Sequence, residues 1–481
     1  MYIFAGKIKF RAKTLQIMKG LLKDQKQTNL FAPNLIQIIN PNEELVVLAG
    51  QIDWNYFDKE FSPLYSTTGR PAAPIRVMVS LLLLKHLYNY GDETVIAAWV
   101  QNPYYQYFSG MDAFQWKGPC DPSDLVHFRN RIGPDGFEKI LKYTAQMHGD
   151  VGKEDTQVTD TTVQETNITY PTDTKLQVKI IKSCVRIADE TGIVLRQRYP
   201  RKLKQLLLES RFGHHPRRRK KAKSARRQIK TIAGRLVREL VRKLDKSDHS
   251  VYFEKLKLFE RQLRQRKKDT DKIYSFHAPH TYCIAKGKEH KEYEFGTKVS
   301  ITSGINSGVI MSAYCLEKND YDGHTLSRTL EQIKRLFGTV PKRLVADRGY
   351  RGVNRIGDTD IATPGAGKKN LSGYEKRKLR RMFRRRTAIE PLIGHLKTDH
   401  RMGRSFYKGI SGDQINVLLA CSAWNLKKYM KKLREAFSLV VFSGLRRITD
   451  RLKRDFLALE ALIWNRYIPS KVWVEGFEMS F

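Results

Sequence analysis

The sequence predicts a mixed α/β protein: an all-helical N-terminal region, then a mixed sheet that carries a long basic helical insertion. Three observations predict this class. Up to about residue 150, apolar positions recur at helical spacing between turn signals. From about residue 155, short alternating segments rich in β-branched residues take over. Between 196 and 272 the chain has 28 Lys and Arg against 8 Asp and Glu, yet Ile229, Ile232, Leu236 and Leu240 keep a helical spacing.

The charge of the chain points to a polyanionic partner. Its 481 residues include 88 Lys and Arg against 49 Asp and Glu, a formal net charge of +39. A hydrophobic content of 41% excludes a wholly disordered polycation, because that much apolar surface can offset the entropy lost on ordering. The field attracts polyanions, of which nucleic acid is the commonest inside a cell, and a membrane surface is the competing ligand.

No segment has the features of a membrane span or a secretory signal. The most apolar run, 75–90, is interrupted by Lys85 and His86 and is shorter than the roughly 20 residues that a spanning helix needs. A buried helix explains the run better, so a cytoplasmic protein is expected. The five cysteines are scattered without a C-x-x-C pair, which argues against a zinc ribbon or a disulfide framework.

Residues 30–150 are predicted to form the helical N-terminal domain, after an extension of uncertain status at 1–29 within which Met18 is a possible start. The expected helices cover 75–90, then 93–101 with Asp92 as N-cap, then a segment from 121 to a stop at Gly133-Pro134. The last helix carries Arg129 and Arg131. These are candidate DNA contacts, although a plain helical bundle fits the same pattern equally well.

The second part, 151–432, is predicted to hold a sheet interrupted by the basic insertion at 196–272, which is expected to form a long helical hairpin. A tail of unknown role, 433–481, is expected to begin as an amphipathic helix. The expected strands are 156–163, 282–285, 293–302, 309–316, 343–347 and 361–363, and the other expected helices are 173–189, 324–337 and 374–404.

Two aspartates lie on strands that are candidates for the centre of this sheet. Asp160 is within one strand and Asp347 ends another. A carboxylate among residues that would be buried is costly unless it is paired or bound to a metal. For either residue alone, a turn cap or an arginine pair explains the position as well.

A third carboxylate, Glu390, lies on a basic helical segment. Phe383, Arg386, Glu390 and Lys397 follow offsets of three, four and seven, which place them within a roughly 60° arc of one helix face. Pro391 disfavours a continuous helix there, so the helix either kinks or starts at the proline. Three carboxylates on separate elements suit phosphoryl chemistry with two Mg²⁺ or Mn²⁺ ions.

Several long segments of the sequence match, in order, the sequences of one family. They are GRPAAPIRVMVSLLLLKHLYNYGDETVIAAWVQNPYYQYFSG at 69–110, CDPSDLVHFRNRIG at 120–133, VTDTTVQETNITYPTDTKL at 158–176, YDGHTL at 321–326, ADRGYRG at 346–352 and RRRTAIEPLIGHLKTDHRMGR at 384–404. From about 30 to 430 the chain resembles the DDE transposases of bacterial insertion sequences. The likeness is to the insertion-sequence-five group, whose catalytic domain is ribonuclease H-like.

The resemblance implies roles for particular residues. Asp160, Asp347 and Glu390 match the metal-binding DDE triad. Arg386 and Lys397 match the basic members of the signature Tyr-x2-Arg-x3-Glu-x6-Lys and would hold phosphate or steady the helix. Phe383 stands where that signature has Tyr, which leaves no hydroxyl at that position.

The resemblance also implies a reaction and partners. Water would cut the element ends, and the exposed 3′-OH would then join target DNA. The partners would be the terminal inverted repeats and the target, bound by a nucleoid-associated homodimer in a bacterial cytoplasm. A nuclease of the same fold and a non-catalytic DNA-binding derivative are the alternatives.

The basic stretches are the candidate DNA grip. The insertion would hold flanking or target DNA, although a solvated hairpin used for dimer contact is the competing interpretation. The candidate DNA contacts in these stretches are Arg217, Arg218, Arg219, Lys220, Lys221, Arg384 and Arg385.

Overall fold

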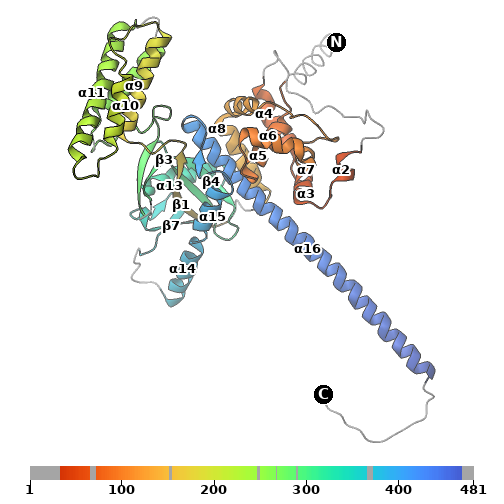
Figure 1. Ribbon diagram of the computed structural model, residues 1–481. Coiled ribbons are helices and arrows are strands. Elements are labelled where there is room, and N and C mark those ends of the chain that lie inside the picture. Colours follow the sequence, from red (N-terminus) through yellow and green to blue (C-terminus); the bar gives the residue numbers. More distant parts are fainter. Residues whose placement is uncertain are drawn as a thin grey trace, which may run out of the picture.

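The computed structural model confirms the predicted fold class: a helical N-terminal region joined to a mixed α/β sheet with a helical insertion (Figure 1). The extension 1–29 and the end of the C-terminal tail lie outside the residues that the structure describes. Those residues are 33–65, 72–150, 154–245, 250–266, 268–288, 291–365 and 372–467.

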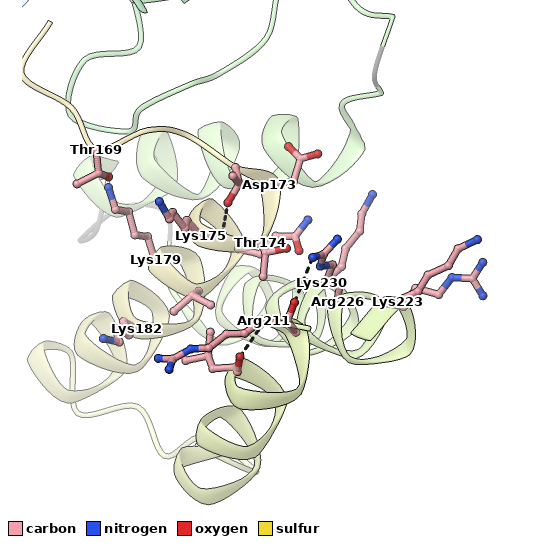
Figure 2. A pocket seen from close by; sticks show the side chains of 16 residues that line it. Thr169, Asp173, Thr174, Lys175, Lys179, Lys182, Arg211, Lys223, Arg226 and Lys230 are labelled. Atoms are coloured by element: carbon pink, nitrogen blue, oxygen red, sulfur yellow. Dashed lines mark hydrogen bonds between the residues drawn. The ribbon is translucent and has the colours of Figure 1, made fainter. Parts of the chain in front are cut away.

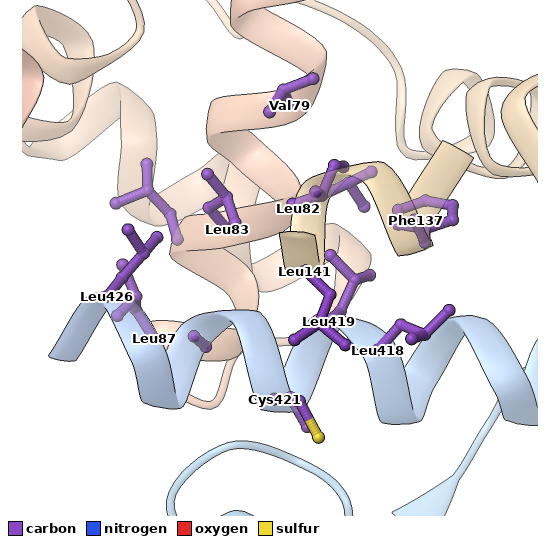
Figure 3. Packing of buried hydrophobic residues seen from close by; sticks show 14 of the residues in the cluster. Val79, Leu82, Leu83, Leu87, Phe137, Leu141, Leu418, Leu419, Cys421 and Leu426 are labelled. Atoms are coloured by element: carbon purple, nitrogen blue, oxygen red, sulfur yellow. The ribbon is translucent and has the colours of Figure 1, made fainter. Parts of the chain in front are cut away.

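The N-terminal region packs around one fully buried helix, α5 (Ile75–Leu87). Val79, Leu82 and Leu83 of this helix are buried against Leu418 and Leu419 of the C-terminal helix (Figure 3). In the part of the chain that is described, no helix is long and apolar enough to cross a membrane. The other helices of the region are α2 (Leu35–Ile38), α3 (Glu44–Gln51), α4 (Trp54–Phe61), α6 (Asp92–Gln101), α7 (Pro103–Phe108) and α8 (Pro122–Gln146), with a 3-10 turn, η1, at Ser62–Leu64.

Two predicted helix boundaries in this region are wrong. Gly91, not Asp92, is the N-cap of α6, and its N–H donates to Thr94 Oγ1 at 2.6 Å. The helix expected to stop at Gly133-Pro134 bends there and continues. Gly133 adopts φ +59°, a conformation that glycine reaches without strain, and Pro134 then starts the second segment, where a missing N–H costs little.

The sheet is mixed, and its central strand is β1 (Thr156–Thr166). On one side β1 pairs antiparallel with β3, and on the other it pairs parallel with β5 and β8. The strand order is β2-β3-β1-β5-β7-β6, with β4 on β3. The remaining strands are β2 (Tyr282–Lys288), β3 (Lys291–Gly304), β4 (Ile310–Cys315), β5 (Arg343–Val345), β6 (Arg355–Ile356), β7 (Thr359–Ala362) and β8 (Arg404–Ser405).

The two faces of the sheet are covered by different helices. Val158 and Val345 face the core that contains α15 (Ile389–Thr398) and the first part of α16 (Gly409–Tyr467). Leu344 and Ala346 point the other way, toward α13 (Thr325–Phe337). This alternation is the ordinary two-residue period of a strand, in which successive side chains point to opposite faces of the sheet. α14 (Gly373–Arg386) precedes α15, and 3-10 turns η3 and η4 cover Asp322–His324 and Arg348–Tyr350.

The basic insertion is helical, as predicted, but it is larger than a hairpin. It contains α10 (Pro200–Ser210), α11 (Arg219–Lys243) and α12 (Ser250–Arg264), and the preceding α9 (Asp173–Glu190) joins them. Ile180 and Ile187 of α9 share a buried cluster with Ile229 and Leu236 of α11. We call α9 to α12 the helical unit. It has its own core and projects from the end of β1 (Figure 1).

A reciprocal pair of buried histidines joins α5 to the turn after α15. His86 Nδ1 lies 3.1 Å from the carbonyl oxygen of His400, and His400 Nδ1 lies 2.9 Å from the carbonyl oxygen of His86. Burial lowers the pKa of His86 well below its usual range and also lowers the pKa of His400. Both side chains are therefore neutral in the folded protein near pH 7.

This pair predicts that the protein loses stability as the pH falls below about 6.5. Histidine in the unfolded chain has a pKa of about 6.5, so below that pH the unfolded chain binds protons while the buried pair stays neutral. We expect the free energy of unfolding to fall between pH 7.5 and 5.5, approaching about 1.4 kcal/mol per pH unit for each histidine. Urea denaturation at several pH values measures the slope. His400→Asn should flatten it, and an equal slope in that variant would contradict the assignment.

Candidate active site

Asp160 lies on β1, and Asp347 lies two residues beyond the end of β5 (Arg343–Val345), the parallel neighbour of β1. Val158 of β1 is in register with Val345 of β5, and each aspartate lies two residues farther along. Because side chains alternate along a strand, Asp160 projects toward the face on which Val158 and Val345 meet α15. Both aspartates are half-buried. The structure therefore brings these two predicted residues together at one edge of the central strands.

Local backbone contacts hold each carboxylate. Asp160 Oδ1 accepts a hydrogen bond from the N–H of Thr161 at 2.8 Å. Asp347 ends the extended segment and caps η4, with Oδ1 accepting from the N–H of Gly349 at 2.7 Å. The turn predicted after Asp347 is thus the 3-10 turn η4. Asp347 is its N-cap, and the capping hydrogen bond fixes the direction of the carboxylate. One oxygen of each group is engaged in this way.

A third carboxylate, Asp322, lies beside Asp347. A Cβ on Gly349 would lie 2.9 Å from Asp347 Oδ1 and 3.1 Å from Asp322 Oδ2, so both carboxylates approach this glycine closely. Thr161 Oγ1 donates to Asp322 Oδ1 at 2.8 Å, and Lys298 Nζ lies 2.5 Å from the same oxygen. Sequence reasoning gave Asp322 no role, although it lies in the word YDGHTL. Its partners make it an ion-paired support for the loop that presents Asp347.

Tyr350 lies behind the carboxylates and is fully buried. Burial raises the pKa of Tyr350 well above its usual value, and the negative charges of Asp160, Asp322 and Asp347 raise it further. The phenol therefore stays neutral at physiological pH. Its position shows that the three aspartates converge on one small region.

Glu390 comes from a helix that starts one residue before it. α14 ends at Arg386, Thr387 and Ala388 form a turn, and α15 begins at Ile389. Pro391 falls in the first turn, where a helix has no use for its missing N–H. The predicted arc from Phe383 to Lys397 is therefore wrong as one continuous helix face. It holds only within α15, between Glu390 and Lys397.

α15 packs on the face of the sheet that carries Val158 and Val345. Its Ile389 and Leu392 are buried in the same cluster as Val158 and Val345. Glu390 itself is 64% exposed and lies 3.6 Å from a guanidinium nitrogen of Arg386, which is 15% exposed. Phe383 is partly buried against the same core, so the aromatic position of the signature serves packing here.

The donor set suits a hard divalent cation, because carboxylate oxygens are the ligands that Mg²⁺ and Mn²⁺ prefer. Within the described residues, no three His, Cys, Asp or Glu side chains stand close enough to hold an ion. The structure brings Asp160 and Asp347 together and leaves Glu390 beside Arg386. The residues fit a metal by the chemistry of their carboxylates.

Lys397, near the end of α15, lines a separate basic pocket. This pocket, of about 380 Å³, is formed where β1, α15 and β8 meet. Glu165 of β1 lies 3.6 Å from a nitrogen of Arg404 there, and Arg401 stacks over Phe406 at 5.5 Å. Lys397 is partly buried at its wall. An anion could be held beside the end of β1 by these cations.

One predicted DNA contact, Arg129, is wrong. Its guanidinium binds both carboxylate oxygens of Asp92 at 2.9 and 2.8 Å and stacks over Tyr407 at 4.3 Å, and its side chain is only 6% exposed. Arg129 is therefore a structural residue. Arg131 is exposed and stacks over Tyr65 at 4.3 Å, which leaves its guanidinium at the surface.

The remaining predicted DNA contacts are exposed. Residues 217–221 lie at the turn into α11, where Arg218 stacks over Phe212 and Lys221 lies 3.2 Å from Glu209. Arg384 and Arg385 lie on the last turn of α14, and Arg385 binds the side chain of Asn306. These positions are compatible with DNA contact and are not tested by the structure.

Two family models match successive parts of the chain. Residues 33–131 match the model of a transposase domain, DUF772, and residues 254–426 match the model of the transposase DDE domain. The second match includes Asp347 and Glu390, and Asp160 lies between the two. An uncharacterized protein of Rhizobium meliloti, ORF8 in the nfe locus, is 41% identical over 196 residues, which are 40% of this chain and 95% of that protein. No solved structure matches.

The two transposase matches follow one another in the order of the helical region and the sheet that carries the paired aspartates. The chain therefore belongs to the insertion-sequence DDE transposases, enzymes that act on DNA.

Proposed function

We propose that this chain cuts the ends of its insertion sequence and joins them to target DNA at the site formed by Asp160, Asp347 and Glu390. The observation that carries the proposal is the register of β1 and β5. Val158 and Val345 pair in neighbouring parallel strands, Asp160 and Asp347 each follow two residues later, and the helix of Glu390 packs on the face of the two valines. The insertion-sequence-five group remains our assignment from sequence words.

The chemistry is two phosphodiester displacements at one site. In the first, water attacks the phosphorus at the element end, the P–O3′ bond breaks, and a free 3′-OH remains with a 5′-phosphate. In the second, that 3′-OH attacks a phosphodiester of the target, and the target's own 3′ oxygen leaves. Both steps build negative charge on the phosphate oxygens, which cations near the site would stabilise.

The residues divide this work by their chemistry. DDE transposases generally depend on a divalent metal, and Asp160, Asp347 and Glu390 would hold Mg²⁺ or Mn²⁺, in one or two ions. Bound there, the metal would supply charge stabilisation at the phosphate and a more acidic attacking hydroxyl. Arg386, one-seventh exposed and paired with Glu390, would orient that carboxylate. Lys397 and Arg404 would contact phosphates of the bound DNA.

The test is incubation of the full chain with Mg²⁺ and a duplex that carries the candidate terminal repeats. We expect 3′ nicking at the repeat ends, then joined product when target DNA is added. A chelator in excess should abolish both, because carboxylates alone cannot stabilise the attack on a phosphate.

The other outcomes decide between the alternatives. Nicking that never gives joined product would indicate a nuclease of the same fold. Binding to the repeats without nicking, in Mg²⁺ and in Mn²⁺, would indicate a non-catalytic DNA-binding protein. We also propose that two copies act together on paired ends, which mixing catalytically inactive and active chains would reveal.

A further inference from the structure

A basic groove lies on the helical unit. It has a volume of about 940 Å³ and is formed by α9, α10 and α11 (Figure 2). Asp173 is the acidic residue at its wall. The cations that line it are Lys175, Lys179, Lys182, Arg211, Lys223, Arg226, Arg227 and Lys230.

The helical pattern of the sequence gathers these cations on one side. On α9, Lys175, Lys179 and Lys182 are spaced by four and three residues, so they share a face. On α11 the spacing from 223 to 230 does the same. In Figure 2, Lys179 and Lys182 lie on one side of the groove and Lys223 and Lys230 on the other. The opposite faces of both helices form the apolar core of the unit.

The charge in the groove is not neutralised by the protein. Of the described residues, none forms an ion pair with Lys179, Lys182, Arg227 or Lys230. The carboxylate of Asp173 accepts hydrogen bonds from the amides of Gln262 and Gln265 instead, at 3.4 and 3.1 Å. Like charges gathered in this way repel one another and do nothing for the fold. They are explained by an anionic ligand that is bound from outside.

The lining indicates which anion. No aromatic side chain is among the residues that line the groove. Proteins that hold single strands stack the bases on aromatic rings, whereas contacts to the backbone of a duplex need cations alone. Two rows of cations on neighbouring helices match the phosphates of a polymer better than one small anion. We propose that this groove binds the phosphate backbone of duplex DNA without reading its sequence.

The groove can hold the same DNA molecule that occupies the catalytic site. Thr169, at its wall, follows Asp160 by nine residues, which span at most about 30 Å of extended chain. That length is close to one helical turn of a duplex, about 34–36 Å. A duplex that extends roughly one turn beyond the cut could therefore lie in the groove. This last step rests on the proposed transposase function, whereas binding by the groove does not.

The experiment measures the salt dependence of binding by the full chain to a fluorescent duplex of about 30 base pairs and unrelated sequence. Divalent metal is left out, so that no DNA is cut. The groove variant carries Lys179→Gln, Lys182→Gln, Arg227→Gln and Lys230→Gln. The matched control carries Arg201→Gln, Lys204→Gln, Arg235→Gln and Arg242→Gln, which remove the same charge from exposed positions of α10 and α11 that do not line the groove.

Each phosphate contact contributes about 0.9 to the slope of log affinity against log salt. We expect the groove variant to lose about 3 to 4 of that slope and at least about tenfold in affinity near 0.15 M salt. The control should lose less than about threefold. An equal loss in both variants, or no loss in the groove variant, would overturn the proposal.

Two further measurements keep the result decisive. Circular dichroism and thermal unfolding check that the groove variant is folded. If it is not, the double variant Lys179→Gln, Arg227→Gln is measured instead, and its slope of log affinity against log salt should fall by about 2. Mg²⁺-dependent nicking should be unchanged in the control variant, whose substituted residues do not line the groove. If the wild-type chain never nicks, the proposed function fails while the groove result stands.

Discussion

Asp347→Asn should reduce 3′ nicking at the element ends by at least about a thousandfold, a loss of about 4 kcal/mol of transition-state stabilisation. The amide keeps the shape of the side chain, and its oxygen can still accept the hydrogen bond from the N–H of Gly349, so the turn should survive. It lacks the negative charge that a divalent cation requires. Asp160→Asn and Glu390→Gln should have effects of the same order.

The matched control is Asp360→Asn, on the strand next to β5. Asp360 is exposed on β7, opposite Arg343 in the register of the two strands, and belongs to none of the groups described above. Its nicking rate should stay within about twofold of wild type. DNA binding without metal should be unchanged in all four variants. Full nicking by Asp347→Asn would show that the paired aspartates are structural.

Asp92→Ala should lower the free energy of unfolding by about 3–5 kcal/mol, because it leaves two buried cations without their counter-charge. Lys85 Nζ lies 2.7 Å from Asp92 Oδ1, and the side chains of Lys85 and Arg129 are 3% and 6% exposed. Lys85 also donates to the hydroxyl of Tyr407 at 2.8 Å. The cluster thus ties α5, α6 and α8 to the segment that follows β8. Chemical denaturation near pH 7 measures the loss.

The control for this prediction is Glu60→Ala in the same region. Its partner Lys139 lies at 2.7 Å, as close as in the buried pair, but both side chains are at least one-third exposed. A surface pair contributes about 0–1 kcal/mol, so the variant should be nearly as stable as wild type. Equal effects from the two substitutions would show that the Asp92 cluster is not special.

The Asp92 cluster also has a pH signature. Burial acts to raise the pKa of Asp92, but its bonds to Arg129 and Lys85 outweigh burial and lower the pKa to about 2. In the unfolded chain the same carboxyl titrates near 3.9. The stabilisation is therefore complete above about pH 4 and is lost as the pH falls toward 2. Stability lost near pH 6 belongs instead to the histidines whose pKa values burial lowers, which are His86, His400 and His148.

The paired aspartates could be predicted because their signals are local. Alternating β-branched residues are enough to place Asp160 on a strand. A short apolar run places Asp347 just after a strand, although β5 ends at Val345, two residues earlier than predicted. Their register is not local. It depends on hydrogen bonds between segments almost two hundred residues apart, so the sequence predicted two acidic strands and not their alignment.

The errors in the prediction also have physical causes. Arg129 is a cation on a helix expected at the surface, and only the fold shows that Asp92 and Tyr407 enclose it. The break at Thr387 carries no glycine, and the proline that hinted at it lies four residues later. Asp322 was overlooked because its neighbours Thr161 and Lys298 come from other strands.

The high charge of the insertion did not indicate how many residues of the helical unit are buried. Leu206, Ile229 and Phe259 are buried, and the partner that buries them includes α9, which lies before the basic stretch begins. A boundary drawn from charge at 196 therefore separates α9 from the helices that it packs against. Burial is set by long-range packing, and composition alone does not report it.

The most direct test of the central claim is to map where a metal binds on the chain. Ferrous iron can replace Mg²⁺ among oxygen ligands, and with ascorbate and peroxide it generates radicals that break the backbone close to the ion. We predict breaks near Asp160, Asp347 and Glu390 together, suppressed by excess Mg²⁺ and absent in Asp347→Asn. Breaks near the aspartates without any near Glu390, or breaks unaffected by Asp347→Asn, would contradict a site shared by the three carboxylates.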